Sequence, residues 1–531
     1  MAATRPREEH KEDSTTGYSK VQTTVYRKEK TMTNRTTQAG SVRIKPPGAM
    51  VMLLAALAIF FAAMVAFASP VKAATLKVTN TNDSGDGSLR KAINTANGNG
   101  QADTINITAK GTVVLASQLP NIITDMQIVG PGANTFAVSV KGNFRAFRIY
   151  DRAKATVSGL KVTKVDAYDR GGGIYNVGVL TVKNSTITGN SYGYGGGIYN
   201  EKSEDTAQGG TLTVNNSTIS GNTASGWTTS SGGGINNDGG TLTVNKSTIS
   251  GNTADRGGGI ASDIYLPGQK TTIINSTISG NFVRSTGGGL YNDYGLTTIK
   301  FTTIKNNTAP KGRGGGVAND NDGSEPPRTV AFSSVIAGNR GTDVDFAPVI
   351  ANPSNSFTSK GYNLIGDGNA TRAFKARGDQ VGITKPGRII RGKPGDDTLR
   401  GTAGSDIIYG LGGGDTIRSL GGTDVILAGP GNDAIYSGAG NDTVYGGTGA
   451  DKLYGYTGVD RLFGQGGNDR LVGGDSSDRL VGGPGVDRIY GQSGNDFLNV
   501  RDKKPKDVAN GGTGKDRCVA DRGDRRVNCE R

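Results

Sequence analysis

An aspartate recurs every nine residues between residues 392 and 499 of this 531-residue chain. An aliphatic residue stands two positions after each of these aspartates. A glycine stands two positions before each one, except where Ser476 replaces it. The spacing holds without a slip through Asp397, Asp406, Asp415, Asp424, Asp433, Asp442, Asp451, Asp460, Asp469, Asp478, Asp487 and Asp496.

This pattern has the ingredients of a metal site. Glycine in a turn can adopt a positive φ and expose carbonyl oxygens, and the aspartate adds an anionic oxygen. Calcium binds about six to eight hard oxygens of these two kinds. Each unit is long enough for one turn and one short strand, so two units make a coil. The spacing therefore predicts a calcium-bound parallel β-roll over residues 392–499, with all twelve aspartates as metal ligands and calcium as the cofactor.

Successive aspartates should alternate between the two edges of this roll. Asp397, Asp415, Asp433, Asp451, Asp469 and Asp487 fall on one edge, and the other six fall on the opposite edge. Like charges stacked about 5 Å apart repel by about 3 kcal/mol at an effective dielectric constant near 20. One aliphatic residue per unit gives only a thin core to offset this repulsion. We therefore expect the segment to be disordered without calcium and to fold with it.

Two cysteines, Cys518 and Cys529, stand eleven residues apart in a basic tail and are the only ones in the sequence. Outside the cell such a pair usually forms a disulfide, and the absence of a nearby histidine disfavours a zinc site. One further repeat unit at residues 511–518 places Cys518 in the aliphatic position. The bond is therefore expected to cap the open end of the roll.

The elements before this array repeat at longer intervals. Leu212 and Val214 alternate with Thr213, and Ile219 continues the apolar set after a short Asn-Ser break. Similar units close at Asn190, Asn222, Asn252, Asn281 and Asn307, with 26 to 32 residues between closures. Short alternating strands of this kind cannot bury a core alone, but stacked parallel coils can. We predict a β-helix of about ten coils, with the asparagines forming a side-chain ladder at one corner.

Several motifs resemble known families. The nonapeptide array resembles the repeats-in-toxin (hemolysin-type) calcium-binding repeat. Residues 76–80 and 87–93, the GGGIYN and NSTISGN units, and residues 335–339 and 361–367 are similar to bacterial right-handed parallel β-helix surface proteins, although Gly87 replaces the usual cysteine of the opening motif. The resemblance implies an all-β chain, in which a right-handed parallel β-helix precedes the roll.

The amino-terminal region predicts export. An apolar run at residues 49–68 follows basic residues and precedes small-residue sites ending at Ala68 and Ala73. This order describes a signal peptide, although about 20 apolar residues could also anchor the chain in a bilayer. We therefore expect a basic flank with a signal peptide or membrane anchor (1–73), a β-helix (74–370), a linker (371–391), the roll (392–499) and a basic disulfide-bonded cap (500–531).

The residue content favours a non-catalytic, extracellular or cell-surface protein. Its single histidine, His10, precedes the apolar run, and no dense acidic and basic patch is expected on one face of the β-helix beyond Asp166, Asp169 and Arg170, with Asp255 and Arg256 further on. A polysaccharide-modifying lyase or uronate epimerase remains an alternative, because such enzymes join β-helices to similar arrays. A glycan-binding adhesin is another. Its surface would be built by loops at residues 201–210 and 320–327 and by exposed tyrosines: Tyr175, Tyr192, Tyr194, Tyr199, Tyr265, Tyr291 and Tyr294.

The net charge of +14 makes an anionic cell-surface glycan a candidate partner besides calcium. No motif combines basic and aromatic residues as nucleic-acid-binding domains do, so no nucleic-acid partner is expected. Any contact with a membrane would be made through the apolar amino-terminal segment, if it is retained.

Overall fold

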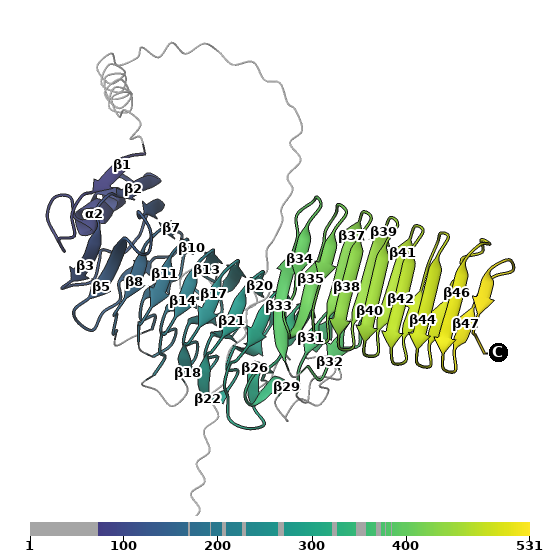
Figure 1. Ribbon diagram of the computed structural model, residues 1–531. Coiled ribbons are helices and arrows are strands. Elements are labelled where there is room, and N and C mark those ends of the chain that lie inside the picture. The colour runs from purple at the N-terminus through teal and green to yellow at the C-terminus, as the bar shows by residue number, and fades with distance from the viewer. Residues whose placement is uncertain are drawn as a thin grey trace, which may run out of the picture. The chain divides into compact units, whose positions relative to one another are not determined.

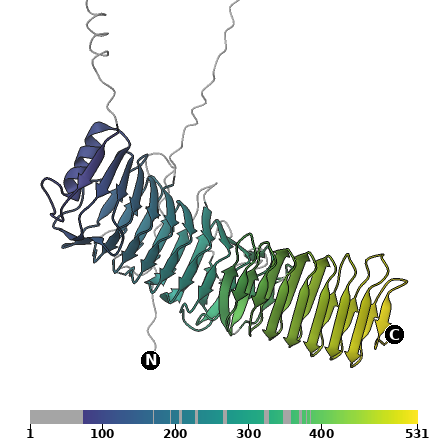
Figure 2. The ribbon, with the colours of Figure 1, turned by 45° about the horizontal axis from the view of Figure 1, so that its top comes forward.

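The computed structural model describes residues 73–530, except 168–169, 192, 204–208, 226–229, 264–269, 321–326, 347–356, 368–372, 378 and 384. Strands of successive coils lie side by side along both solenoid segments (Figures 1 and 2). The chain is nearly all β, as predicted: a parallel β-helix is followed by a parallel β-roll. No helix within the described ranges is both long and apolar enough to cross a membrane. The apolar run at residues 49–68 lies outside those ranges.

Three parallel sheets form the sides of the β-helix. Sheet A contains β1 (Thr75–Val78), β2 (Asp103–Ile107), β4 (Met126–Val129), β7 (Lys154–Ser158), β10 (Val179–Lys183), β13 (Thr211–Asn215), β16 (Thr241–Asn245), β20 (Lys270–Ile274), β24 (Leu296–Lys300), β27 (Arg328–Phe332) and β30 (Phe357–Ser359). Sheet B contains β3 (Gly111–Leu115), β5 (Phe136–Val140), β8 (Lys161–Thr163), β11 (Thr186–Thr188), β14 (Thr218–Ser220), β17 (Thr248–Ser250), β21 (Thr277–Ser279), β25 (Thr303–Lys305), β28 (Val335–Ile336), β31 (Leu364–Ile365) and β32 (Gln380–Val381).

Sheet C forms the third side. It contains β6 (Phe147–Ile149), β9 (Ile174–Asn176), β12 (Ile198–Glu201), β15 (Ile235–Asp238), β19 (Ile260–Asp263), β23 (Leu290–Tyr294), β26 (Gly314–Asn319) and β29 (Thr342–Phe346). A small additional pair consists of β18 (Thr253–Arg256) and β22 (Phe282–Thr286). Sheets A and B each hold eleven strands among the described residues, close to the ten coils expected from the repeat length.

The period-two alternation decides which side chains enter the β-helix core. Leu212, Val214 and Ile219 are fully buried, as predicted, and each pairs in register with its equivalent one coil away. At the amino-terminal end, α2 (Leu89–Asn99) covers the first coil with Leu89 and Ile93. Ser88 caps this helix by accepting a hydrogen bond from the Lys91 amide, which satisfies one of the free amides of the first turn.

An asparagine ladder runs along one corner of the β-helix, as predicted. Nδ2 of Asn222 donates to Oδ1 of Asn252, and Asn252 donates in the same way to Asn281, both at 2.9 Å. The row extends from Asn190 through Asn307 to Asn339. Each of these amides both donates and accepts, so the buried row leaves no side-chain group unpaired.

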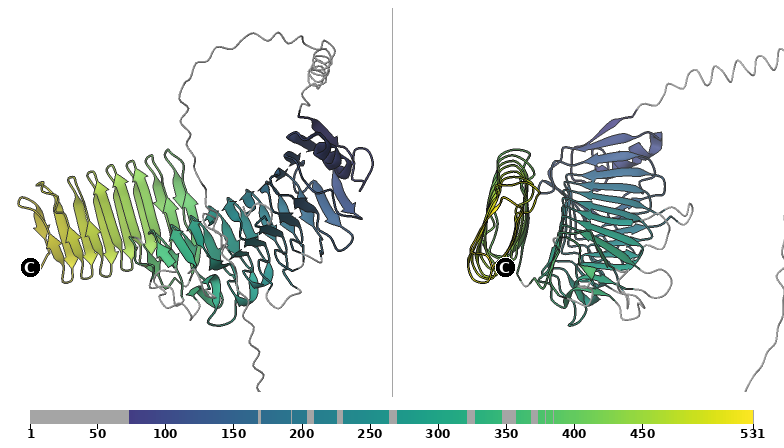
Figure 3. Two further views of the ribbon diagram at one scale, coloured as in Figure 1. Left: turned by 180° about the vertical axis from the view of Figure 1, so that it is seen from behind. Right: turned by 90° about the vertical axis from the view of Figure 1, so that its right-hand side faces the viewer.

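The roll consists of two parallel sheets on opposite sides of a thin core; the right-hand view in Figure 3 shows its coils as flattened loops. Roll sheet 1 contains β33 (Pro386–Arg391), β35 (Ser405–Tyr409), β37 (Val425–Pro430), β39 (Thr443–Thr448), β41 (Arg461–Gly466), β43 (Arg479–Val481), β45 (Phe497–Asn499) and β47 (Arg517–Val519). Roll sheet 2 contains β34 (Thr398–Arg400), β36 (Thr416–Arg418), β38 (Ala434–Ala439), β40 (Lys452–Thr457), β42 (Arg470–Asp475), β44 (Arg488–Ser493), β46 (Val508–Thr513) and β48 (Arg525–Val527).

Both ends of the roll reach beyond the period-nine segment. Residues 386–391, which the sequence assigned to a linker, form the first strand of roll sheet 1. Strands β46, β47 and β48 add coils from the region assigned to the basic cap. The core consists of two facing rows of aliphatic side chains, one from each sheet, including Ile435, Val444 and Leu453, all with no exposed surface.

Candidate metal-binding rows

The aspartates of the roll form two continuous rows, one at the entry to each sheet. Within a row, the backbone N–H of each aspartate donates to Oδ1 of the aspartate one coil further on. For example, Asp424 donates to Asp442 and Asp442 donates to Asp460, both at 2.8 Å. The six aspartates from Asp397 to Asp487 are linked in one row, and those from Asp406 to Asp496 in the other. The structure therefore places the predicted residues on the two predicted edges.

The second oxygen of each interior carboxylate lacks a partner. Oδ2 is buried without a hydrogen bond in Asp415, Asp424, Asp433, Asp442, Asp451, Asp460, Asp469, Asp478, Asp487 and Asp496. The first members of the rows differ: Asp397 is partly exposed, and Oδ2 of Asp406 accepts from the Thr402 amide at 2.6 Å. A buried carboxylate oxygen without a partner is costly, and its repetition at equivalent positions indicates a common missing ligand.

Glycine makes room beside most of these oxygens. A Cβ added at Gly464 would collide with Oδ2 of Asp469, and the nearest backbone oxygen to that position belongs to Gly482 of the next coil. Gly455 stands in the same relation to Asp460 and Gly473. Beside these glycines the space is bordered by carbonyl and carboxylate oxygens and by no side chain of the turn. At Asp424, Asp433 and Asp442 the equivalent position holds Ser419, Ala428 and Ser437, and the two serine hydroxyls interact with the carboxylates of Asp424 and Asp442.

This donor set fits calcium. Among the described residues, no three carboxylate, histidine or cysteine side chains converge where they could hold a metal ion. An ion at the rows would therefore be held by aspartate Oδ2 together with backbone carbonyl oxygens. Calcium accepts such a mixed, all-oxygen shell, whereas zinc favours nitrogen and sulfur ligands. When bound, the ion would neutralise the negative charge of the buried carboxylates.

Burial perturbs the carboxylates strongly. Burial raises the pKa of Asp424 to about 9, with the neighbouring charge of Asp442 contributing, and it raises the pKa of Asp442 to about 7. The backbone hydrogen bond from the preceding coil opposes the shift in both. The metal-free rows are therefore electrostatically unfavourable when ionised.

The turns adopt one conformation whether or not glycine is present. Gly447 and Gly483 have φ of +125° and +113°, and Gln465, which replaces glycine between them in the column, keeps φ at +78°. Leu420, Tyr456, Ser476 and Gln492 do the same. A non-glycine residue in this region costs about 1–2 kcal/mol. The substituted turns keep the shape of the site, and each carries local strain.

Sequence reasoning missed part of the rows. The Asp487 amide donates to Asp507 Oδ1 and the Asp496 amide to Asp516 Oδ1, both at 2.8 Å. Asp507 and Asp516 are buried, and their Oδ2 atoms also lack partners. The signal was weak because each lies twenty residues after its predecessor, so the strict period is lost. The unit around Asp516 had been recognised, but its aspartate was not counted as a ligand.

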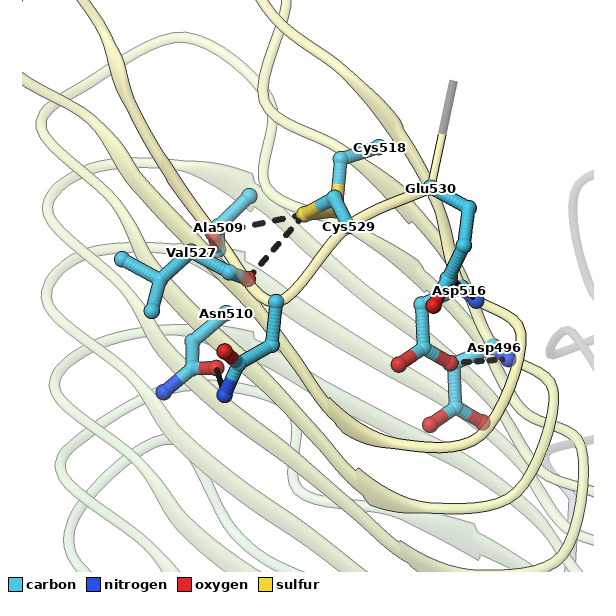
Figure 4. The surroundings of a disulfide bond; sticks show 9 residues. Asp496, Ala509, Asn510, Asp516, Cys518, Val527, Cys529 and Glu530 are labelled. Atoms are coloured by element: carbon cyan, nitrogen blue, oxygen red, sulfur yellow. Dashed lines mark hydrogen bonds between the residues drawn. A yellow bond between two sulfur atoms is a disulfide. The ribbon is translucent and has the colours of Figure 1, made fainter.

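A disulfide closes the last coils, as predicted. Cys518 of β47 is bonded to Cys529, and Figure 4 shows the bond beside Ala509 and Val527. Glu530, one residue later, accepts a hydrogen bond from the amide of Asp516 and so ends the second row with a carboxylate. The first row ends similarly, since Asp524 accepts from the Asp507 amide at 3.2 Å. The bond therefore lies in the last coils, beside the end of the second row.

The outer face of sheet C corrects one expectation for the β-helix. Tyr175 donates to Glu201, Tyr199 donates to Asp238, and Arg170 forms an ion pair with Glu201. The expectation that no acidic and basic patch would gather on one face was therefore wrong. Loop insertions of different length separate these residues in the sequence. The sequence alone therefore does not show that they lie at neighbouring positions of successive coils.

The cluster is closed to large ligands. Tyr199 and Tyr291, expected to be exposed, each have only 1% of their surface exposed, and burial raises the pKa of both phenols. Asp166, on the same side of the chain, accepts from Ser191 at 2.9 Å, and Arg284 pairs with Asp255 at 3.3 Å. Tyr192, Tyr265 and Asp169 lie outside the described residues.

These features define a β-solenoid whose final coils carry rows of buried carboxylates at glycine turns. The family model of the RTX calcium-binding nonapeptide repeat (four copies) matches residues 391–426, 411–444, 419–453, 436–471 and 463–498. Residues 391–498 are thus a run of RTX calcium-binding repeats, and the family binds calcium ions.

Other comparisons add little. No curated protein matches the chain. Among solved structures, the Agl-KA catalytic domain is 13% identical, with 87% of this chain and 69% of that chain covered and a TM-score of 0.32. The ORF18 protein of Geobacillus virus E2 is 10% identical, with coverage of 92% and 64% and a TM-score of 0.16. Likeness at this level supports no argument about function.

Proposed function

We propose that this chain is a secreted or cell-surface calcium-binding protein in which calcium drives the folding of the roll after export. The twelve aspartates predicted from the repeat, together with Asp507 and Asp516, are the proposed side-chain ligands. One observation carries the proposal: the same carboxylate oxygen is buried without a partner in twelve successive rungs, from Asp415 to Asp516. A single chemical cause explains an unpartnered oxygen at every rung, and a hard cation as its ligand is the simplest one.

The balance of forces supports folding that depends on calcium. The roll core is thin, with one aliphatic side chain per repeat unit, such as Leu453 and Leu462. Burying one such side chain contributes about 1.5–3 kcal/mol. Ionised aspartates about 5 Å apart oppose stacking by about 3 kcal/mol per neighbour at a dielectric constant near 20. The two terms are of similar size, so the metal decides whether the coils assemble.

The β-helix is proposed as a non-catalytic stalk. Its corner rows are uncharged asparagines that satisfy one another, and the mixed cluster on sheet C buries Tyr199 and Tyr291. The only histidine of the sequence, His10, lies before the apolar segment, so histidine acid–base chemistry is not at hand in the β-helix.

Export is supported by the order of residues at the amino terminus and by the repeats. Proteins with RTX repeats are typically secreted, and a basic flank followed by an apolar run and small residues is typical of an export signal. A disulfide also fits an oxidising compartment.

Hydrogen exchange measured by mass spectrometry on the full chain tests the proposal. Peptides from residues 392–530 are expected to be protected in calcium and to exchange rapidly in EGTA. Peptides from sheets A and B, such as those spanning β13 and β14, serve as the internal control and should be protected in both. Equal protection of the roll with and without calcium would overturn the proposal. Magnesium in place of calcium should restore little protection, because it demands a smaller octahedral shell.

A further inference from the structure

The outward face of roll sheet 2 carries stacked tyrosines. Tyr436 of β38 and Tyr454 of β40 pair in register, and their rings stack with centroids 5.2 Å apart and planes 5° from parallel. Tyr456, two residues further along β40, is 51% exposed, and its ring lies 6.5 Å from that of Tyr454. Tyr436 and Tyr454 cover part of each other's face, so Tyr456 presents the most accessible ring of this tyrosine platform.

A column of basic residues continues beside this platform. Lys452, Arg470 and Arg488 follow one another in register on β40, β42 and β44, and all three are exposed. None of them forms an ion pair with any residue in the described part of the chain. Like charges on directly paired strand positions destabilise a sheet. Arg461 and Arg479 of roll sheet 1 are paired in the same way, but there the next position is Phe497. Only roll sheet 2 continues the basic column to a third position, and this continuation favours an external anion on that face.

Further arginines stack on the aromatic column. The guanidinium of Arg418 lies 4.9 Å from the centroid of the Tyr436 ring, and that of Arg470 lies 4.7 Å from the Tyr490 ring. Stacking holds a guanidinium flat while its N–H groups stay available for a carboxylate. Between Arg418, Leu420, Tyr436 and Tyr456 the surface is hollowed into a pocket of about 440 Å³.

The opposite face of the roll is occupied at the equivalent level. Tyr409 of roll sheet 1 packs edge-on against Phe301, and Tyr445 packs against Tyr362, both rings belonging to the β-helix segment. Arg377 also lies over the Tyr445 ring, 4.6 Å from its centroid. Roll sheet 1 therefore buries Tyr409 and Tyr445, while Phe463 and Phe497 further along it stay partly exposed. Roll sheet 2 leaves Tyr436 and Tyr454 partly exposed and Tyr456 exposed.

We infer that the tyrosine platform and the basic column of roll sheet 2 form a binding surface for a linear acidic polysaccharide that runs along the roll axis. Sugar rings pack on the exposed ring of Tyr456, and their carboxylates pair with Lys452, Arg470 and Arg488. Both columns step by one strand spacing, about 4.8 Å, so a periodic polymer can make the same contacts at each coil. The charge of the face is complementary to a polyanion, and the proposed export places it among extracellular glycans. The inference needs a folded roll and therefore rests on the proposed function.

Binding of the full chain to hyaluronan, measured by biolayer interferometry in calcium, tests the inference. Two charge-matched variants decide it. R470Q/R488Q removes two charges from roll sheet 2, and R461Q/R479Q removes two from the equivalent paired positions of roll sheet 1. The first is expected to weaken hyaluronan binding at least about fivefold and to reduce its salt dependence, whereas the second leaves both nearly unchanged.

The aromatic contribution has its own control. Y456A is expected to abolish measurable binding, and Y456F to retain it, because packing against a sugar needs the ring and not the hydroxyl. Dextran, an uncharged glucan, should not bind to the unmodified protein. Hydrogen exchange of each variant in calcium confirms that the roll is folded.

Several results would overturn the inference. These are no hyaluronan binding by a folded roll, an equal loss in the two charge variants, or binding only to a polythymidylate oligonucleotide or to phosphatidylglycerol vesicles. If the roll instead proves equally protected in EGTA, the proposed function fails, and hyaluronan binding can still be scored on the folded protein. The two failures are therefore distinguishable.

Discussion

Replacing Asp442 by asparagine separates the two roles of a row carboxylate. Oδ1 of Asp442 accepts from the Asp424 amide at 2.8 Å, and its own amide donates to Asp460. Oδ2 is buried without a partner. Asparagine has nearly the same shape and can keep the Oδ1 contact, but it replaces the free anionic oxygen by an NH₂ group. The D442N change therefore removes the charge and one metal ligand without removing the ladder.

The expected effects have opposite signs with and without calcium. Burial raises the pKa of Asp442 from the ordinary 3.8 to about 7. Without metal, this acid stabilises the folded roll at low pH, and that contribution is lost as the pH rises from about 4 through about 7. Keeping Asp442 ionised and buried at pH 8 thus costs about 4 kcal/mol. The amide avoids this cost and places its NH₂ beside the Ser437 hydroxyl, so burying it costs at most about 1–3 kcal/mol. The free energy of unfolding of the metal-free roll should therefore rise by at least about 1 kcal/mol.

With calcium, the variant lacks an anionic ligand and should need more of the ion to fold. Two titrations measure both effects by the strand signal in circular dichroism: calcium added at pH 8, and acid added in EDTA. D442N is expected to raise the calcium midpoint and to begin folding in EDTA at a higher pH than the unmodified chain. D475N is the matched control, since Asp475 is exposed and stands outside both rows. An unchanged calcium midpoint, or a metal-free roll that is less stable in D442N, would refute the reasoning.

Three further perturbations address other parts of the molecule. The double variant C518S/C529S should speed hydrogen exchange in β46–β48 by releasing a loop closure that contributes about 2–3 kcal/mol, with little change in β38–β40; uniform protection would show that the bond is not a cap. Asn252→Ala should lower the melting temperature of the β-helix equally with and without calcium. The change removes the hydrogen-bond partner of the buried side chains of Asn222 and Asn281, at a cost of about 3 kcal/mol. A loss of stability that depends on calcium would contradict this. Gln492→Gly should stabilise the calcium-loaded roll by about 1 kcal/mol, because Gln492 holds φ at +78°; a lower melting temperature would show that the turn is not strained.

Much of the roll could be predicted because its period is strict. With two units to a coil, position alone assigned each aspartate to its edge and each aliphatic residue to the core. The prediction failed where the period did: the insertion between Asn499 and Asp507 hid two further rungs, which only the hydrogen bonds to Asp487 and Asp496 reveal. The period in the sequence gives the number of residues in a coil. An aspartate joins a row, however, when the backbone brings it next to the aspartate of the previous coil.

The β-helix shows the same limit more strongly. The ladder through Asn222 and Asn252 was predictable, since the repeat around it is legible. A second ladder joins Asn176, Asn200 and Asn237 at 2.6 Å per step, but these residues are 24 and 37 apart. Loops of unequal length stand between them, so no single offset aligns them. The burial of Tyr199 has the same origin, because its neighbours come from coils whose spacing in sequence is irregular.

The β-helix and the roll each contain a row of buried polar side chains at a coil corner, and each row needs hydrogen-bond partners. The two rows use different side chains, and this difference explains why calcium is needed only in the roll. An asparagine both donates and accepts: Asn252 accepts from the amide and side chain of Asn222, and it donates to Asn281 and to the Ile219 carbonyl. An ionised aspartate can only accept. One oxygen takes the backbone N–H of the coil before, and among the described residues the other has no hydrogen-bond donor. The asparagine row is therefore complete when the protein folds, whereas the aspartate row is complete only with a cation. Asparagine and aspartate differ in one non-hydrogen atom of the side chain, a nitrogen in place of an oxygen. This difference at each rung confines the metal dependence to the roll.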